Sequence, residues 1–153
     1  MNEPLRLFVF SLDERFYALS LSAVERVVHT VEITPLPKAP EIVLGLINFQ
    51  GTVVPVVNIR RRFRLPERNI ELNDLMIVAR TVNRRVALWV NSVSGIIECR
   101  DQEIIAPDRI VQGLEYIEGV VKTKEGILFI HNLDRFLSLE EEKTLNDALS
   151  SMG

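Results

Sequence analysis

Residues 45–63 decide the fold, and they read Gly45-Leu-Ile-Asn48-Phe-Gln50-Gly51, then TVVPVVNIRRRF. Two apolar runs, residues 44–48 and 52–59, flank the dipeptide Gln50-Gly51. Glycine adopts turn conformations that other residues resist, so this arrangement predicts a β-hairpin. Because proline cannot donate to a strand ladder, Pro55 predicts that the second run is an edge strand or contains a bulge.

Short apolar runs separated by polar turns continue on both sides of this hairpin. They predict two further hairpins, one formed by residues 75–81 with 85–90 and one by residues 116–123 with 127–133. They also predict single strands at residues 5–12, 16–21 and 27–33. A small β chain must close its sheets or cover their edges. The sequence therefore predicts an all-β fold in which two small barrels fit better than one large barrel, although the periodicity leaves a sandwich open. No flexible linker separates the halves, so we expect them to be in contact.

Two segments depart from the strand pattern. Residues 34–40 contain three prolines, which predicts a stiff, extended surface connection. Ser138 and Glu141 form a capping-box pattern ahead of a partial apolar stripe, which predicts a C-terminal helix over about residues 138–150. The weak stripe does not decide whether this helix packs on the body or protrudes.

Composition narrows the classes of function. The 153 residues are 47% apolar and 25% charged with a net charge of −3, which argues against nucleic acid as the main partner. The basic run Arg60, Arg61, Arg62 and Arg64 leaves phosphate or RNA contact as an alternative to a solvated strand end or a protein contact. No apolar run reaches the ~20 residues that span a bilayer, so we expect no membrane insertion. The one cysteine, Cys99, lies in an apolar stretch, so we expect it to be a buried apolar residue. Because a single cysteine cannot form an internal disulfide and we see no signal peptide, the sequence predicts a cytoplasmic location.

No pattern of catalytic or metal-binding residues is visible. His29 and His131 each lie in an apolar stretch without a second ligand at metal spacing. No phosphate-binding glycine loop and no close Ser, His and Asp set is present. We therefore predict a protein that is not an enzyme, with no catalytic, cofactor or metal site.

The most distinctive motif lies in residues 43–60. Its residues Gly45, Asn48, Gly51 and Pro55 match the order and spacing of the pattern GxxNLRGxxxPVxDLR. This segment resembles the CheW-like family, the bacterial chemotaxis coupling proteins. The resemblance extends over almost the whole chain, with supporting pieces at residues 7–10, 17–19, 23–24, 34–37, 118–121 and 132–137.

The resemblance implies one CheW-like domain over residues 1–153, built from two packed five-stranded SH3-like barrels and a C-terminal helix. From it we expect the first barrel at about residues 14–82, the second at about residues 5–12 plus 83–137, and the helix at residues 138–150.

The resemblance also implies a non-catalytic adaptor. Family members bridge the cytoplasmic tip of a methyl-accepting chemoreceptor and the regulatory domain of a chemotaxis histidine kinase. Val24, Leu75 and Met76 match family positions that line the receptor-binding groove. Self-association through barrel edges is compatible with this interpretation.

Two positions at the implied receptor-binding face differ from the family pattern. Arg26 stands where the family usually has Glu, and Gln50 stands where it usually has Arg. Asn58 similarly replaces the usual Asp. Because complementary charge sets specificity and rate more than raw affinity, these changes predict an altered choice of receptor, as in a gliding, pilus or other non-flagellar chemosensory pathway.

Two alternatives stay open. The chain could bind the kinase alone, as a competitor or inhibitor. It could also be a small-ligand binder or an enzyme on a double-barrel scaffold, for which His29, His131 and Asp134 are the candidate residues.

Overall fold

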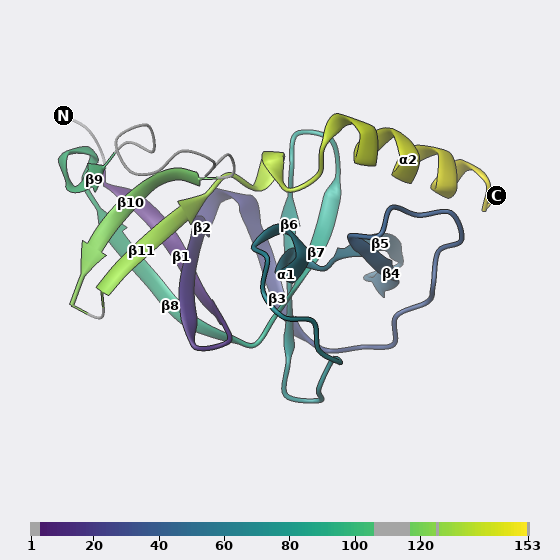
Figure 1. Cartoon of the computed structure of the whole chain (residues 1–153), viewed down its shortest axis with the longest axis horizontal. Coiled ribbons are helices and arrows are strands. Elements are labelled where there is room, and N and C mark those ends of the chain that lie inside the picture. The colour runs from purple at the N-terminus through teal and green to yellow at the C-terminus, as the bar shows by residue number, and fades with distance from the viewer. Residues whose placement is uncertain (1–3, 106–116, 125, 153) are drawn as a thin grey trace.

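The computed structural model describes residues 4–105, 117–124 and 126–152. They form two curved sheets side by side along the long axis, with a helix, α2 (Leu139–Ser150), over one of them (Figure 1). The mostly β architecture with a C-terminal helix confirms the predicted fold class.

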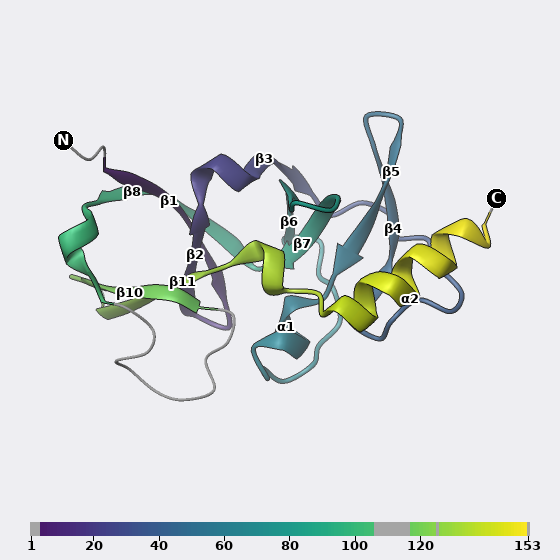
Figure 2. The ribbon, with the colours of Figure 1, turned by 90° about the horizontal axis from the view of Figure 1, so that it is seen from above.

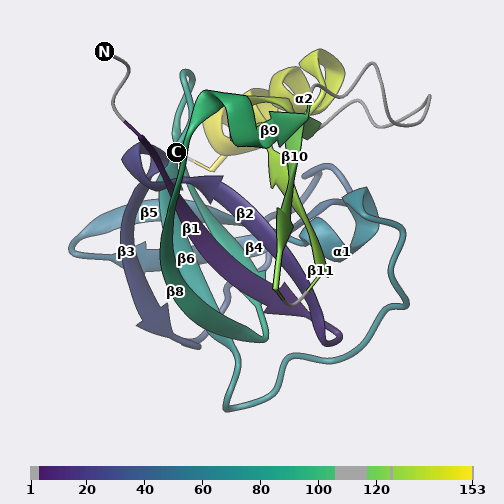
Figure 3. The ribbon, with the colours of Figure 1, turned by 90° about the vertical axis from the view of Figure 1, so that its left-hand side faces the viewer.

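The first sheet has six strands in the order β8-β1-β2-β11-β10-β9. All pairs are antiparallel except β2 with β11. Seen along the long axis, β8, β1, β2 and β11 curve around a common interior (Figure 3). The bounds are β1 (Leu5–Leu12), β2 (Arg15–Ser20), β8 (Ser92–Cys99), β9 (Ile104–Ile105), β10 (Ile117–Thr123) and β11 (Gly126–His131). The two-residue strand β9 makes this sheet one strand larger than predicted.

The second sheet has five strands in the order β3-β6-β7-β5-β4, with β5 and β7 parallel. Its ends approach each other at Thr34, whose N–H donates to Leu46 O at 2.8 Å and whose O accepts from Leu46 N at 2.7 Å. This bridge joins the segment after β3 to β4 and closes the barrel. The bounds are β3 (Val24–His29), β4 (Val43–Phe49), β5 (Thr52–Val57), β6 (Leu75–Arg80) and β7 (Arg85–Val90).

Strand pairing corrects the predicted division of the chain between the barrels. We expected residues 14–82 in the first barrel, but β2 lies in the six-stranded sheet between β1 and β11. We expected residues 83–137 in the second barrel, but β7 lies in the five-stranded sheet beside β6. The reason is local: the tight turns at residues 13–14 and 81–84 hold each hairpin in one sheet, so the chain changes sheet after β2 and after β7.

The three predicted hairpins are present as β4–β5, β6–β7 and β10–β11. Pro55 was expected to mark an edge strand or a bulge. β5 is not an edge strand, because it lies between β4 and β7, and the register shift in its pairing with β4 lies between Val43 and Gly45, not at the partner of Pro55. Pairing with β7 begins only at Val56, so the missing N–H of Pro55 falls just before that ladder. The strand end predicted around Arg60 is instead a short helix, α1 (Ile59–Arg62).

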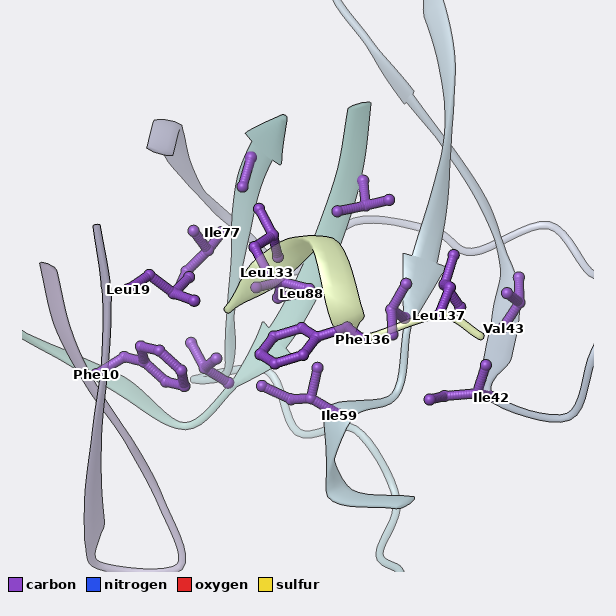
Figure 4. Close-up of a cluster of buried hydrophobic side chains, with 14 of the residues drawn as sticks. Phe10, Leu19, Ile42, Val43, Ile59, Ile77, Leu88, Leu133, Phe136 and Leu137 are labelled. Carbon is purple, nitrogen blue, oxygen red and sulfur yellow. The ribbon is translucent and has the colours of Figure 1, made fainter. Parts of the chain in front are cut away.

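Apolar side chains form three cores. One fills the five-stranded barrel around Met76 and Trp89, and one fills the six-stranded barrel around Leu7 and Ile130. The largest, here called the junction core, lies between the barrels, where Phe10 and Leu19 face Ile77, Leu88 and Ile59 (Figure 4). Strands such as β6 and β7 are therefore buried on both faces, which explains their nearly continuous apolar sequence.

The C-terminal segment covers one side of the junction core. Phe136 and Leu137 precede α2, and Leu145 and Ala148 of α2 are buried in the same core. The predicted capping box is present, since Ser138 Oγ accepts from Glu141 N at 3.0 Å and Ser138 N donates to Glu141 Oε1 at 2.8 Å. The helix therefore packs on the body of the protein.

Candidate functional site

The junction core reaches the surface in a half-buried apolar strip along β3. We call it the junction strip, and it comprises Leu21, Ala23, Val24, Val27, Leu75 and Val93. These residues come from the short 3₁₀ turn η1 (Leu21–Ala23), β3 and the first residues of β6 and β8. Each packs against the junction core on one side while keeping part of its surface exposed.

A bulge in β3 gives the strand two different faces. The pairing of β3 with β6 shifts register between Val24 and Arg26. As a result Val24 and Val27 pack on the junction core, whereas Arg26 lies opposite Val78, on the face that fills the five-stranded barrel. Among the described strands β3 pairs only with β6, so its outer edge is free for most of its length.

The structure separates the residues predicted to contact a receptor. Val24 and Leu75 lie in the junction strip, and Arg26 is exposed on the other face of the same strand. Gln50 is exposed at the tip of the β4–β5 hairpin, which lies along the same side of the molecule as β3 (Figure 2). Met76 is 0% exposed and belongs to the core of the five-stranded barrel, so it is not placed for contact.

The glycines and the asparagine of the motif in residues 43–60 stabilise the β4–β5 hairpin and its contact with Thr34. Gly45 has φ +153°, and a Cβ there would meet the Thr34 carbonyl oxygen and lie 2.8 Å from Ile33 Cγ2. The Thr34–Leu46 bridge thus requires glycine at this position. Gln50 and Gly51 form the hairpin turn, and both have positive φ, 51° and 81°. Asn48 Oδ1 accepts from Gly51 N at 3.0 Å, so a side chain at the end of β4 stabilises this turn.

A buried ion pair joins the two barrels on the side opposite to β3. Arg60 in α1 has a side chain only 1% exposed, and its guanidinium binds the carboxylate of Asp13 in the β1–β2 turn. The Arg60 Nη1–Asp13 Oδ2 distance is 2.8 Å, and Nη1 also donates to Pro66 O at 2.9 Å. The hydrogen bond from Arg60 holds the pKa of Asp13 below its usual value.

Asp74, a buried carboxylate, continues this polar network. Asp74 Oδ2 accepts from Trp89 Nε1 and from Glu71 N, each at 2.8 Å, and its Oδ1 accepts from Arg68 Nη2 at 2.8 Å. Burial alone raises the pKa of Asp74, but these hydrogen bonds outweigh burial and lower it. Asn91 links the two groups, because it donates to Asp74 Oδ1 at 3.3 Å and accepts from Arg60 Nη2 at 3.2 Å.

Sequence reasoning missed this network. One local signal was present: Asn58 is a good helix N-cap, and its Oδ1 accepts from Arg60 N at 3.2 Å. Two more arginines of the basic run are also paired within the chain, whereas Arg64 is exposed. Arg61 pairs with Glu41 and Glu67, and Arg62 pairs with Glu141 of α2. These ion pairs give three of the four arginines a structural role, which weakens the phosphate or RNA alternative for this segment.

The candidate residues for small-ligand chemistry have separate surroundings. His29 is exposed on β3, and the Asp134 carboxylate accepts from Val82 N at 2.8 Å. His131 is buried among Tyr17, Phe63 and Phe136, and burial lowers its pKa to about 3. Among the described residues, no three His, Cys, Asp or Glu side chains lie close enough to hold a metal ion.

The expectations for the cysteine and for membrane insertion can be compared with the structure. Cys99 is buried, as predicted, and packs in the core of the six-stranded barrel. In the described ranges, no helix has the length and apolar character needed to cross a membrane.

Comparison with known proteins gives one consistent result. The CheW-like domain family matches residues 6–141. The protein named Chemotaxis protein CheW of Treponema pallidum is 24% identical over 94% of this chain and 88% of its own length. The protein of that name from Rhizobium meliloti is 28% identical over 93% of each chain. The crystal structure of the scaffolding protein TtCheW from Thermoanaerobacter tengcongensis superposes with a TM-score of 0.82 at 28% identity, covering 91% of this chain and 96% of that one.

Proposed function

The chain belongs to the CheW-like domain family, and from this premise we propose that it is an adaptor that couples chemoreceptors to a chemotaxis-type histidine kinase. One observation carries the proposal: 91% of the chain superposes on the scaffolding protein TtCheW, and the match covers 96% of that protein. The receptor partner is the cytoplasmic tip of a methyl-accepting chemoreceptor, and the kinase partner is its regulatory domain. The adaptor therefore works in the cytoplasm.

The junction strip is the surface that suits the receptor tip. A receptor tip is a helical hairpin, and helices bind proteins by laying an apolar face along an apolar surface. The strip offers half-buried residues that are already held in place by the junction core, so little conformational entropy is lost on binding. The free edge of β3 beside it leaves room for a partner.

We propose that the adaptor has no catalytic role of its own. Groups that would be candidates for catalysis are committed to structure: His131 is buried in an aromatic cluster, the Asp134 carboxylate accepts from Val82 N, and Asp74 accepts a buried hydrogen bond from Trp89 Nε1. Its contribution to signalling is to position the kinase relative to the receptor.

The test is a reconstituted assembly of receptor tip fragments on vesicles, kinase and the full chain. We expect the chain to bring the kinase to the vesicles and to make kinase autophosphorylation depend on the receptor. Val27→Asp places a charge in the junction strip and should abolish receptor binding while kinase binding persists. Ser94→Asp, on an exposed position of the other barrel, is the control and should act like the wild type. Failure of the wild-type chain to bind either partner would refute the proposal.

A second candidate function is binding of the kinase alone, as a competitor or inhibitor. The departures at Arg26 and Gln50 favour it, because both side chains are exposed and their changed charges would act on a receptor rather than on the fold. A binding assay with the kinase regulatory domain and no receptor separates the two functions. Kinase binding with no binding to any receptor tip supports the second.

A further inference from the structure

Three arginines share one face of the five-stranded sheet next to β3. Arg26 lies opposite Val78, and Arg80 lies two residues along the strand from Val78, directly opposite Arg85. Residues directly opposite each other on neighbouring strands project to the same face of a sheet, and so do residues two apart on one strand. The three arginine side chains therefore share one face, at the rim of the barrel core. We call this group the arginine rim.

Among the residues that the structure describes, Glu25 is the one carboxylate paired with these arginines. Glu25 Oε1 accepts from Arg85 Nε at 3.0 Å and lies 3.6 Å from Arg80 Nε. Arg26 makes no ion pair with any residue that the structure describes, and the Arg80 side chain is 62% exposed. The rim therefore presents an excess of positive charge on a chain whose net charge is −3.

The arrangement costs stability in the isolated chain. Like charges directly opposite each other on neighbouring strands are destabilising, and Arg80 and Arg85 are such a pair. Several arginines elsewhere in the chain each have an acid partner of their own, as at Arg60–Asp13, Arg68–Asp74 and Arg84–Glu142. At the rim, by contrast, Arg80 and Arg85 share the single acid Glu25, and Arg26 has no described ion pair, so a carboxylate-bearing partner would supply the missing negative charge.

Apolar side chains, some buried and some exposed, lie near the arginine rim. The guanidinium of Arg85 lies 5.7 Å from the centre of the Phe49 ring, which precedes the Gln50–Gly51 turn. Val24 of the junction strip is the neighbour of Glu25, and Val53 on the hairpin is exposed. A partner that covers both surfaces needs an apolar stripe with carboxylates beside it.

We propose that the arginine rim selects receptors whose tip helices carry an acidic face next to the apolar face that covers the junction strip. This inference rests on the proposed function and assigns the charge of the receptor partner. Three arginines and a negative net charge suit a carboxylate-bearing helix better than the continuous phosphate backbone of a nucleic acid.

The experiment titrates the full chain with soluble tip fragments of the methyl-accepting receptors from the same genome, at about 50 and about 300 mM salt. Arg26→Glu is the main variant, because this side chain has no described ion pair to lose. Arg26→Gln removes the charge without reversing it. Arg6→Gln and Arg6→Glu are matched controls on β1 of the other barrel, where the side chain is 65% exposed.

We expect Arg26→Glu to weaken binding about tenfold at low salt, mainly through slower association, and Arg26→Gln to weaken it by less. The Arg6 controls should change affinity less than about twofold. Reversing a glutamate or aspartate on the receptor helix to arginine should restore binding to Arg26→Glu. Thermal unfolding of each variant verifies that it is folded.

The outcomes separate the inference from the function. If the wild type binds a receptor tip but the Arg26 and Arg6 variants behave alike, the rim does not select acidic partners and the inference fails alone. If the wild type binds no receptor tip, the proposed function fails and the inference falls with it. Competition by a short duplex DNA or RNA at the receptor's own affinity would also overturn it, since the rim would then be a phosphate site.

Discussion

Arg60 in the five-stranded barrel and Asp13 in the six-stranded barrel form an ion pair in which only the arginine is fully buried. The Arg60 side chain is 1% exposed and the Asp13 side chain 34%. The arginine also lies 5.5 Å from the centre of the Trp89 ring, so its charge sits in an environment that needs a counter-ion. The pair therefore fixes one barrel against the other at a point where an apolar core alone would not set their relative position.

Asp13→Asn should destabilise the fold strongly. The substitution keeps the shape of the side chain and suits the positive φ of 50° at this turn, but it leaves the Arg60 charge without its counter-ion. Breaking a buried pair by removing one partner costs about 3 kcal/mol in the free energy of unfolding. Equilibrium denaturation in urea at neutral pH measures the loss.

The control for this prediction is the exposed pair Arg6–Glu98, whose side chains are 65% and 56% exposed. Glu98→Gln should change the free energy of unfolding by less than about 1 kcal/mol. The double variant Asp13→Asn with Arg60→Met should recover much of the loss, because no buried charge is left unpaired. Equal losses for the single and the double variant would contradict the explanation.

His131 predicts a pH dependence of stability. Its ring is buried against Tyr17, Phe63 and Phe136, and burial lowers its pKa from 6.5 to about 3. Below about pH 6.5 the unfolded chain binds a proton at this histidine that the folded chain does not. Stability from this group should therefore fall as the pH drops from about 6.5 toward about 3, by up to about 1.4 kcal/mol per pH unit, and should be flat above about pH 7.

The measurement is the difference in the free energy of unfolding between the wild type and His131→Phe at several pH values. Phenylalanine fits the aromatic surroundings and does not titrate, so the difference isolates His131 from the carboxylates. His29→Phe on the exposed face of β3 is the matched control. A wild-type minus His131→Phe difference that stays constant from about pH 7.5 to about pH 4.5 would rule out a buried neutral histidine.

The hairpins could be predicted from the sequence because their signals are local. Turn residues such as Gln50-Gly51 and the apolar runs beside them lie within a few positions of each other. The sheet that each hairpin joins could not be predicted, because it depends on contacts between distant segments such as Tyr17 with Phe129 and Val56 with Ala87.

The same limit explains the errors at the candidate site. Arg60 and Met76 have sequence surroundings that suit an exposed strand end and a groove residue. The burial of Arg60 depends on Asp13, 47 residues away, and the burial of Met76 depends on β6 being covered on both faces. Val24 and Leu75 are half-buried because they pack against the edge of the junction core, whereas Ile77 and Ala79 further along β6 are fully buried in it.

Gly45 and Gly51 should respond very differently to alanine. At Gly45 a Cβ would collide with the Thr34 carbonyl oxygen and with Ile33, at a φ of +153°. Strain and overpacking together should cost about 3–4 kcal/mol and open the barrel at the Thr34–Leu46 bridge. At Gly51 no atom lies within 4 Å of the added Cβ, so only the positive φ of 81° is penalised, at about 1–2 kcal/mol. Urea denaturation of the two variants measures both losses, and equal losses would show that the close approach at Gly45 is not the constraint.

Leu75 and Met76 are neighbours in the sequence, but substitutions there should have different effects, one on receptor binding and the other on the free energy of unfolding. Met76→Ala removes a fully buried side chain from the barrel core and should lower the free energy of unfolding by about 2–4 kcal/mol. The folded fraction should bind a receptor tip as the wild type does, and Val78→Ala in the same core is the control that should behave alike.

Leu75→Ala removes a half-buried side chain of the junction strip, so it should cost less stability and weaken receptor binding about tenfold or more. Denaturation and binding titrations at one temperature test both. Weakened binding by stable, folded Met76→Ala together with unchanged binding by Leu75→Ala would move the contact surface from the junction strip to the other face of β6.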